Sequence, residues 1–418
     1  MKKSQVFYGW YIIAALFIIW AFIGGIVMNS FTTYIEPISA TFGWSYTSIS
    51  FAVSLHHIAQ VLFLPVAGLL VDRLSVRKLV FSGVFLTGLG IFLLSRITSL
   101  GQFYAIYFLI GITTSTCIAT IPLTVVGRWF RKKMALATGI LMAGAGSSGL
   151  MVPLVTRIID IFGWPHAMAI MGLVLIVIIS PLGLIIRSEP EKYGYLPDGD
   201  TYIKPDSNEV QTPVQTMEKL GIKQVLKMRV FWHITIGYVC LYLAGLAVTT
   251  NIMPYLSSIG IDRNSASFLV TGLVVGGLTG RLGFGWLGDR LNKKYVAVTG
   301  IVLVGFSLLL FVYAVPAAEG IIVPAIIIFS LGYGGAVTMQ SVLLKDYFGA
   351  RNLGAILGFS IGITRIGTIV GPPLASWLYE NFHNYNIAWL ILVGFLCIST
   401  LIHLTNPSVN TMKQKKAG

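Results

Sequence analysis

The chain has 418 residues, of which 56% are hydrophobic and only 11% are charged, and its formal net charge is +14. A soluble protein would have about a quarter of its residues charged, so the composition indicates a polytopic membrane protein. The positive charge does not indicate nucleic-acid binding, because the basic residues lie between apolar stretches, where membrane topology accounts for them. The three cysteines lie within apolar runs, which is typical of buried small side chains, so we expect no disulfide, metal or cofactor.

Twelve apolar stretches follow one another along the chain, each close to the ~20 residues that a bilayer crossing needs. Their expected ranges are 8–35, 46–71, 78–96, 101–127, 134–160, 165–187, 230–258, 265–288, 295–314, 321–345, 352–380 and 386–406. The first stretch is not followed by a small-residue cleavage site, so we expect a retained membrane helix and not a signal peptide.

The distribution of Lys and Arg predicts the orientation of these helices. Of the 29 basic residues, 24 lie at the two ends of the chain, in the long polar segment after the sixth stretch, or in the loops on that same side. The other side has only Arg96, Arg157 and Arg263. Because cytoplasmic loops are rich in Lys and Arg, we expect both termini in the cytoplasm and the protein in a plasma or inner membrane. The two remaining cations, Arg281 and Arg365, lie deep inside apolar stretches.

The two halves of the sequence repeat each other. GLLVDRLSVRK, which starts at Gly68, matches GWLGDRLNKK, which starts at Gly285, and other matched residues keep a similar offset. We therefore expect an all-α membrane protein with twelve transmembrane helices in two pseudo-symmetric six-helix bundles. The predicted domains are residues 1–187, a cytoplasmic linker over 188–229 that contains four prolines, and residues 230–418. We expect a monomer embedded in the lipid bilayer.

Arg281 is the strongest candidate for a functional residue. It lies eight residues before Asp289, which opens a charged cluster, so a helix would place it roughly 12 Å inside the membrane. A cation at that depth is costly and by default faces a cavity. Its planar guanidinium matches a carboxylate with two parallel hydrogen bonds and does not lose its proton. The sequence therefore predicts a carboxylate-binding residue.

Three further ionisable residues lie deep in the apolar stretches. Arg365 is 14 residues beyond Arg351, roughly 21 Å from the cytoplasmic face and not level with Arg281, so either a substrate contact or an outer gate contact is open to it. His56 and His57 lie in the outer half of the second stretch. Since neighbours on a helix point about 100° apart, we expect at most one to face a cavity, where it would join proton coupling or bond to another helix.

The remaining candidates are uncharged groups in the membrane and charged groups at its edges. Asn29, Thr114, Asn251 and Tyr333 are candidate substrate-binding residues, although a hydroxyl such as that of Thr114 often bonds only to a carbonyl of the preceding turn. The acidic residues of the apolar stretches all lie at their ends, which argues against a sodium or sugar–proton symporter and suits an anion carrier. We interpret Asp72, Arg73, Asp289 and Arg290 as gating residues at the cytoplasmic face.

Several motifs carry a family resemblance. The repeated pattern G-x-x-x-D-R-x-x-x-R/K resembles the signature of the major facilitator superfamily, apart from Ser75 and Asn292, where that family usually has glycine. Narrower motifs resemble the monocarboxylate porters and the related oxalate–formate antiporters: WFRKKxxxAxG from Trp129, FYGW from Phe7, Pro190-Glu191, and PDG from Pro197.

This narrower resemblance implies that Arg281 binds the carboxylate of the substrate. Animal monocarboxylate porters place an aspartate four residues before that arginine, whereas this chain has Gly277, so a proton-relay role for such an aspartate does not carry over.

These observations favour a secondary active transporter of small carboxylates such as lactate or pyruvate, coupled to protons and working by alternating access. An anion exchanger of the oxalate–formate type stays open as the alternative. We do not expect an enzyme, because no metal cluster, nucleophile–base motif or phosphate-binding loop occurs at a usable position.

The predicted topology can be tested by cysteine labelling. In a variant without its native cysteines, a single Asp206→Cys substitution in the predicted linker should be labelled by a membrane-impermeant maleimide only after the cells are permeabilised. Labelling of this position in intact cells would contradict the predicted orientation.

Overall fold

Helices form from the apolar stretches throughout the part of the chain that this computed structural model describes, which is residues 7–199, 221–313, 319–350 and 352–407. Within these residues there is no β-strand. The predicted linker over 188–229 therefore lies partly outside the described residues. An all-helical structure is expected for apolar segments in a bilayer, because a helix satisfies its own backbone hydrogen bonds.

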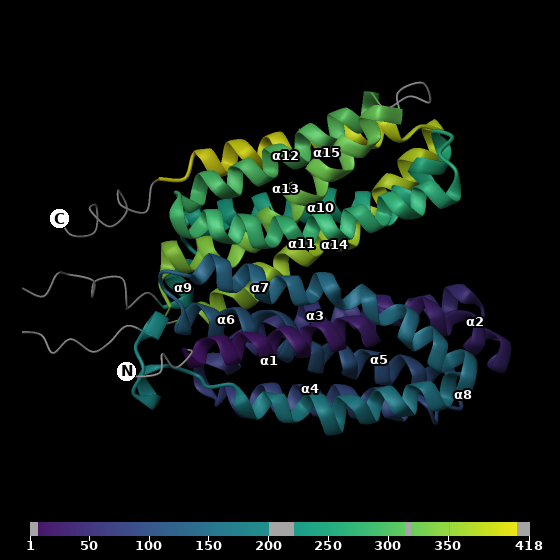
Figure 1. The fold of residues 1–418 in the computed structure, drawn as a ribbon, viewed down its shortest axis with the longest axis horizontal. Coiled ribbons are helices and arrows are strands. Elements are labelled where there is room, and N and C mark those ends of the chain that lie inside the picture. The colour runs from purple at the N-terminus through teal and green to yellow at the C-terminus, as the bar shows by residue number, and fades with distance from the viewer. Residues whose placement is uncertain (1–6, 200–220, 314–318, 351, 408–418) are drawn as a thin grey trace, which may run out of the picture. The chain divides into compact units, whose positions relative to one another are not determined.

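The first half of the sequence forms α-helices that are interrupted by short π-helical and 3₁₀ segments (Figure 1). The α-helices are α1 (Tyr8–Ile23), α2 (Phe31–Phe42), α3 (Tyr46–Arg73), α4 (Val76–Leu94), α5 (Leu100–Thr114), α6 (Thr120–Trp129), α7 (Met134–Ser147) and α8 (Val152–Val174). Among the described residues of this half, the π-helical segments η1 (Gly24–Asn29) and η2 (Ser115–Ala119) lie between α-helices, and η4 (Leu175–Ile179) directly follows α8. Short 3₁₀ turns are η3 (Ser148–Met151), η5 (Ser180–Ile185), η6 (Glu191–Tyr193) and η7 (Pro197–Gly199).

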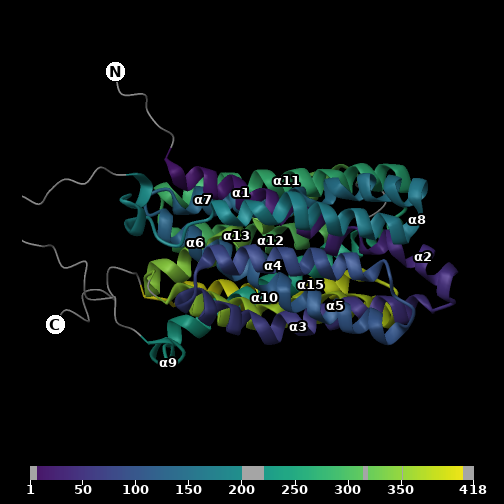
Figure 2. The ribbon, with the colours of Figure 1, turned by 90° about the horizontal axis from the view of Figure 1, so that it is seen from below.

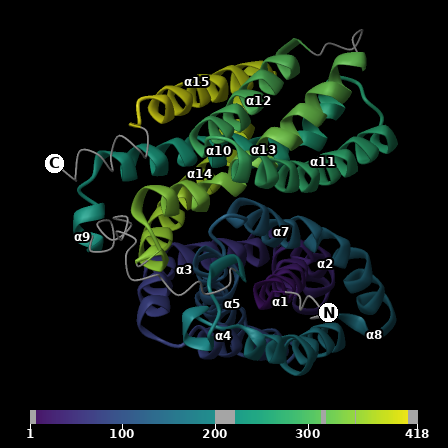
Figure 3. The same ribbon diagram turned by 60° about the vertical axis from the view of Figure 1, so that its left-hand side comes forward.

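The second half consists of longer uninterrupted helices. After the single turn α9 (Ile222–Val225) come α10 (Arg229–Ser258), α11 (Arg263–Arg290), α12 (Lys293–Tyr313), α13 (Glu319–Phe348), α14 (Leu353–Phe382) and α15 (Tyr385–Leu404). α12 packs against both α13 and α15, as Figure 3 shows. These six long helices correspond to the last six predicted membrane spans.

Eleven segments of the described residues are long and apolar enough to cross a membrane. One of them, Met134–Ile185, has 52 residues and covers the fifth and sixth predicted spans. Gly163 separates the two, because its φ of 76° and ψ of 159° are not helical and favour glycine. Pro165 lies two residues after Gly163 and favours the start of a new helix. Counted on both sides of Gly163, the segments match the twelve predicted spans.

The helices group into two compact units. Unit 1 comprises Met1–Lys132, Ile140–Val214 and Ala350–Gly362, and unit 2 comprises Lys133–Gly139, Gln215–Gly349 and Ile363–Gly418. In unit 1, α4 packs against both α5 and α8, and α3 packs against α5 (Figure 2). In unit 2, α13 packs against α11 and α12.

Glycines allow some of these helices to approach very closely. In unit 1, Gly172 of α8 lies against α4, and a Cβ at this position would lie 2.6 Å from the Phe92 nitrogen and 2.8 Å from the Gly88 oxygen. Both of these atoms belong to the backbone, which cannot move away as a side chain can. The contact therefore requires a residue without a side chain.

We expect Gly172→Ala to destabilise the protein. The added methyl group forces α4 and α8 apart, and overpacking of this kind costs about 1–3 kcal/mol, more than the roughly 0.5–1 kcal/mol that alanine gains in a helix. Gly101→Ala is the matched control, because nothing lies within 4 Å of a Cβ built there. Thermal unfolding of the purified variants should show a lower midpoint for Gly172→Ala alone, and equal midpoints would contradict the packing described here.

Candidate functional site

Arg281 lies on α11, two turns before Asp289, and is half-buried in unit 2. Its Nε atom is buried without a hydrogen-bond partner. Within the described part of the chain, no hydrogen bond or ion pair joins its guanidinium to another residue. A charged group among apolar helices is costly unless an opposite charge or hydrogen-bond acceptors compensate it.

Glycines on α11 and α13 bring Arg281 next to Tyr333. A Cβ on Gly280 would overlap the Leu331 carbonyl, and one on Gly334 would overlap the Gly277 carbonyl. The two helices therefore touch backbone to backbone on both sides of the arginine. Because α11 and α13 approach so closely, the Arg281 side chain lies near Tyr333 of α13.

Arg365 of α14 belongs to the same cluster. α14 is held close to α10 by Gly367 and Gly371, whose missing side chains leave room for the Val239 and Leu243 carbonyls. The Arg365 Nε atom is also buried without a partner. Arg281 and Arg365 both interact electrostatically with the same two side chains, Tyr242 and Tyr333. The sequence analysis placed the two arginines at different heights in the membrane. It counted only the helical rise per residue and left out the length of the two side chains, which lets both approach the same tyrosines.

The two tyrosines of this cluster pack against each other. The rings of Tyr242 on α10 and Tyr333 on α13 meet edge to face, with centroids 6.5 Å apart. Gly245 makes this possible, since a Cβ there would overlap the Tyr333 ring, and Phe329 stacks on the Tyr333 ring at 5.7 Å. Neither phenol hydroxyl makes a hydrogen bond within the described residues. The sequence analysis predicted Tyr333 as a site residue but not Tyr242. The position of Tyr242, three residues before Gly245 on the same helix, could have indicated it.

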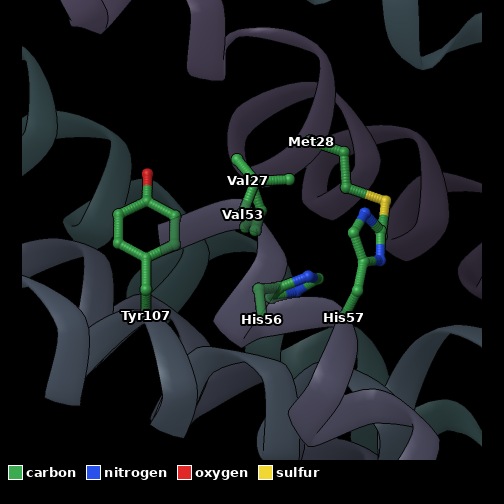
Figure 4. Close-up of a pocket in the computed structure, with 6 residues that line it drawn as sticks. All are labelled: Val27, Met28, Val53, His56, His57 and Tyr107. Atoms are coloured by element: carbon green, nitrogen blue, oxygen red, sulfur yellow. The ribbon is translucent and has the colours of Figure 1, made fainter. Parts of the chain in front are cut away.

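A second polar cluster lies in unit 1, around a cavity of about 90 Å³. Figure 4 shows its lining, which comes from η1, α3 and α5: Val27, Met28, Val53, His56, His57 and Tyr107. Both histidines line the cavity, although we expected at most one to do so. Their rings stand 5.4 Å apart at an angle of 74°.

His56 is connected to α5 by hydrogen bonds. Its Nε2 atom lies 3.1 Å from the Thr114 hydroxyl, and the Gln60 amide donates to that same hydroxyl at 3.2 Å. All three side chains are buried, with exposed fractions of 3% or less. The sequence predicted Thr114 but not Gln60, which could have been found from its position one helical turn after His56.

Two predicted substrate-binding residues make hydrogen bonds that hold the fold. The Asn29 amide donates to the Ser148 hydroxyl at 2.6 Å, joining η1 to η3. Asn251 donates to the Ala247 carbonyl at 2.9 Å and accepts from the Ser376 hydroxyl at 2.9 Å, which joins α10 to α14. Each amide therefore has protein partners and is not part of either cluster.

The predicted gating residues differ in their contacts. Asp72 forms an ion pair with Arg128 at 2.9 Å and accepts from the Ala355 amide at 3.1 Å. Asp289 accepts from the amides of Ala135 and Leu136, at 2.7 and 2.9 Å. In both cases the carboxylate lies at the start of a helix, α14 or α7, where the helix dipole favours a negative charge.

The adjacent arginines do not share these contacts. Arg73 is exposed, and Arg290 lies over the Trp286 ring at 3.9 Å. Arg128, the ion-pair partner of Asp72, was counted from the sequence only as a loop cation.

Comparison with known proteins agrees with this architecture. The family model of the Major Facilitator Superfamily matches residues 15–262 and 239–418. The chain belongs to the major facilitator superfamily. It is a multi-pass membrane transporter.

Relatives within this superfamily include monocarboxylate transporters. The chain is 27% identical to monocarboxylate transporter 12-B of Danio rerio, over 96% of this chain and 87% of the relative. It is 24% identical to monocarboxylate transporter 2 of Homo sapiens, over 96% of this chain and 86% of the relative.

Solved structures show the same fold at low sequence identity. The transporter FucP in its outward conformation has a TM-score of 0.69 and 15% identity, over 94% of this chain and 97% of that one. A bacterial homologue of the iron transporter ferroportin has a TM-score of 0.72 and 14% identity, over 96% of this chain and 99% of that one. The predicted fold of twelve transmembrane helices in two six-helix bundles is thereby confirmed.

Proposed function

We propose that this transporter carries small carboxylate anions, with monocarboxylates such as lactate or pyruvate as substrates, and that Arg281 binds the carboxylate. The observation that supports this most is the guanidinium of Arg281 in unit 2, which has no hydrogen-bond or ion-pair partner among the residues that the structure describes. An anion would supply the missing counter-charge. A charge-assisted hydrogen bond contributes about 1.5–3 kcal/mol, and a bidentate pair adds geometric selectivity for a planar carboxylate.

The two tyrosines would select among carboxylates. Tyr242 and Tyr333 interact with both arginines, and their hydroxyls make no hydrogen bond within the described residues. Such a hydroxyl donates to a carboxylate or to a neighbouring keto or hydroxyl oxygen. The similarity to monocarboxylate transporters over 96% of the chain supports the same substrate class.

We propose further that a proton accompanies the anion and that transport follows alternating access. The described membrane helices have no acidic residue in their middle, so a carboxylate side chain is not available to carry the proton. We also propose that Asp72 and Asp289 act as gating residues, because each accepts hydrogen bonds from the first turn of another helix. Both termini are inferred to be cytoplasmic, in a plasma or inner membrane.

An anion exchanger is the second candidate function, and Arg365 favours it. Two guanidiniums around the same pair of tyrosines, with no carboxylate partner within the described residues, match a dianion better than a monoanion. An exchanger of this kind would return one anion for each that it carries and would need no proton.

Substitution of Arg281 tests the proposed site. Arg281→Lys keeps the charge but loses the planar fork, so lactate affinity should fall at least about tenfold, which corresponds to ~1.4 kcal/mol. Arg281→Gln should abolish binding and uptake. Calorimetry on purified, monodisperse protein measures the affinity, and uptake into proteoliposomes measures transport.

Arg157→Gln is the matched control for charge, because Arg157 is exposed and lies in unit 1. It should bind lactate as the parent does. The proposed role of Arg281 is wrong if Arg281→Gln binds monocarboxylates with the parent affinity.

Substitution of Arg365 separates the two candidate functions. If the cluster binds a monocarboxylate through Arg281 alone, Arg365→Gln should change lactate affinity by less than about threefold. If it binds a dianion, the same variant should lose at least about tenfold in oxalate affinity. Competition calorimetry with the two anions measures both values, and a parent protein that prefers oxalate would favour the exchanger.

A further inference from the structure

Arg187 lies where the chain leaves the membrane at the end of the sixth predicted span. The membrane-crossing segment Met134–Ile185 ends two residues before it, where the backbone changes from helical to extended. Two hydrogen bonds hold the backbone here. The Trp129 indole donates to the Arg187 carbonyl at 2.9 Å, and the Tyr8 hydroxyl donates to the carbonyl of the segment's last residue at 2.9 Å. Since a span ends where hydrocarbon gives way to headgroups, we expect Arg187 at the level of the lipid headgroups.

Two tyrosine rings contact the Arg187 guanidinium. Its central carbon lies 3.9 Å from the centre of the Tyr8 ring on α1 and 4.5 Å from the centre of the Tyr193 ring on η6. The π face of a ring attracts a cation and holds the planar guanidinium in place. These contacts leave the five N–H donors of the guanidinium for acceptor oxygens.

The donors of Arg187 have no acceptor among the residues that the structure describes. The Nε atom is buried without a hydrogen-bond partner, and within these residues the side chain makes no hydrogen bond or ion pair. The acidic residue nearest in sequence, Glu189, pairs instead with Lys192 at 3.0 Å and with Arg128 at 3.8 Å. Arg187 as a whole is only half-buried, so an anion from outside the protein can reach the guanidinium.

The surroundings of Arg187 carry an excess of positive charge. Residues 128–132 and 187–199 contain five basic and three acidic side chains, a net charge of +2. The two segments are joined, because the Asp198 carboxylate accepts hydrogen bonds from the backbone amides of Arg131 and Lys132, at 2.9 and 2.6 Å. An anion is therefore favoured at this surface over a cation.

The surface around the site is suited to a membrane interface. Tyr11, Tyr193 and Tyr195 are exposed, and so are Leu184 and Ile185 at the end of the membrane span. Tyrosine is enriched where hydrocarbon meets the headgroups, and leucine and isoleucine are favourable next to acyl chains. A molecule that contacts both regions has a charged head and an apolar tail.

We infer that Arg187, in contact with Tyr8 and Tyr193, binds the phosphate of an anionic phospholipid. A phosphodiester has two terminal oxygens that match the planar fork of a guanidinium, and the positive surroundings favour a lipid with a net negative charge. The acyl chains lie along the exposed apolar end of the span. This site belongs to unit 1, whereas Arg281 belongs to unit 2, so the inference goes beyond the proposed carboxylate transport and does not depend on it.

Native mass spectrometry of the purified protein measures lipid binding directly. The probe is dioleoylphosphatidylglycerol, with dioleoylphosphatidylcholine as the zwitterionic reference, each titrated into the detergent-solubilised protein. Arg187→Gln should lower the affinity for phosphatidylglycerol at least about tenfold, because the charge and the fork are both lost. Arg187→Lys keeps the charge and should lose less affinity than Arg187→Gln.

Arg77→Gln is the matched control for charge. Arg77 is exposed in the first turn of α4, and Gly183 of η5 lies against Phe81 of the same helix, so Arg77 lies at the same end of unit 1 as Arg187. This variant loses the same charge and should bind phosphatidylglycerol within about threefold of the parent. The inference is overturned if Arg187→Gln stays within that range, if Arg77→Gln loses as much affinity, or if the parent binds both lipids equally well.

Tyr193 provides a test that leaves Arg187 in place. Because Tyr193 is exposed, its replacement does not disturb the core. Tyr193→Ala removes one of the two rings that hold the guanidinium and should lower the affinity for phosphatidylglycerol by about two- to fivefold. Tyr193→Phe keeps the ring and should bind as the parent does, since the Tyr193 hydroxyl makes no hydrogen bond to a described residue. Equal affinities of these two variants contradict the inference.

Competition identifies the source of the phosphate. Inorganic phosphate should leave phosphatidylglycerol bound, because it lacks the acyl chains that contact the apolar end of the span. If inorganic phosphate binds as tightly as the lipid and displaces it, the site takes a soluble anion and the lipid assignment is wrong. No carboxylate substrate is present in these measurements, so a failure of the proposed function, seen as loss of lactate binding in the parent protein, leaves their result unaffected.

Discussion

A guanidinium that cannot give up its proton has to be compensated wherever it lies, and two of them, those of Arg281 and Arg365, lie among apolar helices without an ion-pair partner in the described part of the chain. Much of unit 2 follows from this constraint. α11 and α13 approach backbone to backbone at Gly280 and Gly334, and α14 and α10 do so at Gly367 and Gly371. Glycine takes the place of bulky side chains at these contacts, and the polar side chains of Tyr242 and Tyr333 interact with the two charges.

Unit 1 meets the same apolar environment with neutral polar groups. Its cluster consists of histidine and glutamine side chains that both contact the Thr114 hydroxyl. The two units thus differ in electrostatic character although the sequence repeats between them.

The overall architecture could be predicted from the sequence because apolar length and glycine or proline breaks act locally. The span around Gly163 shows this, since a single non-helical residue divides 52 apolar residues into two membrane crossings. The depth of Arg281 in the membrane was predicted in a similar way, from the rise per residue of a helix, and stays a prediction. It was harder to predict which polar side chains contact one another. The sequence analysis did not predict Tyr242, Gln60 or Arg128 as site residues, and their partners Tyr333, Thr114 and Asp72 lie on other helices. Conversely, Asn29 and Asn251 were plausible ligands by depth alone, yet their amides bond to neighbouring helices.

The π-helical segments carry a geometric consequence for such predictions. A π turn closes its hydrogen bond one residue later than an α turn, so it holds one additional residue, which corresponds to about 100° of rotation about the helix axis. In the rod from Leu100 to Trp129, η2 lies between α5 and α6. The face that continues from Thr114 toward Trp129 is therefore not the one that an unbroken α-helix would present. A helical wheel drawn over this whole span assigns one of its two halves to the wrong side.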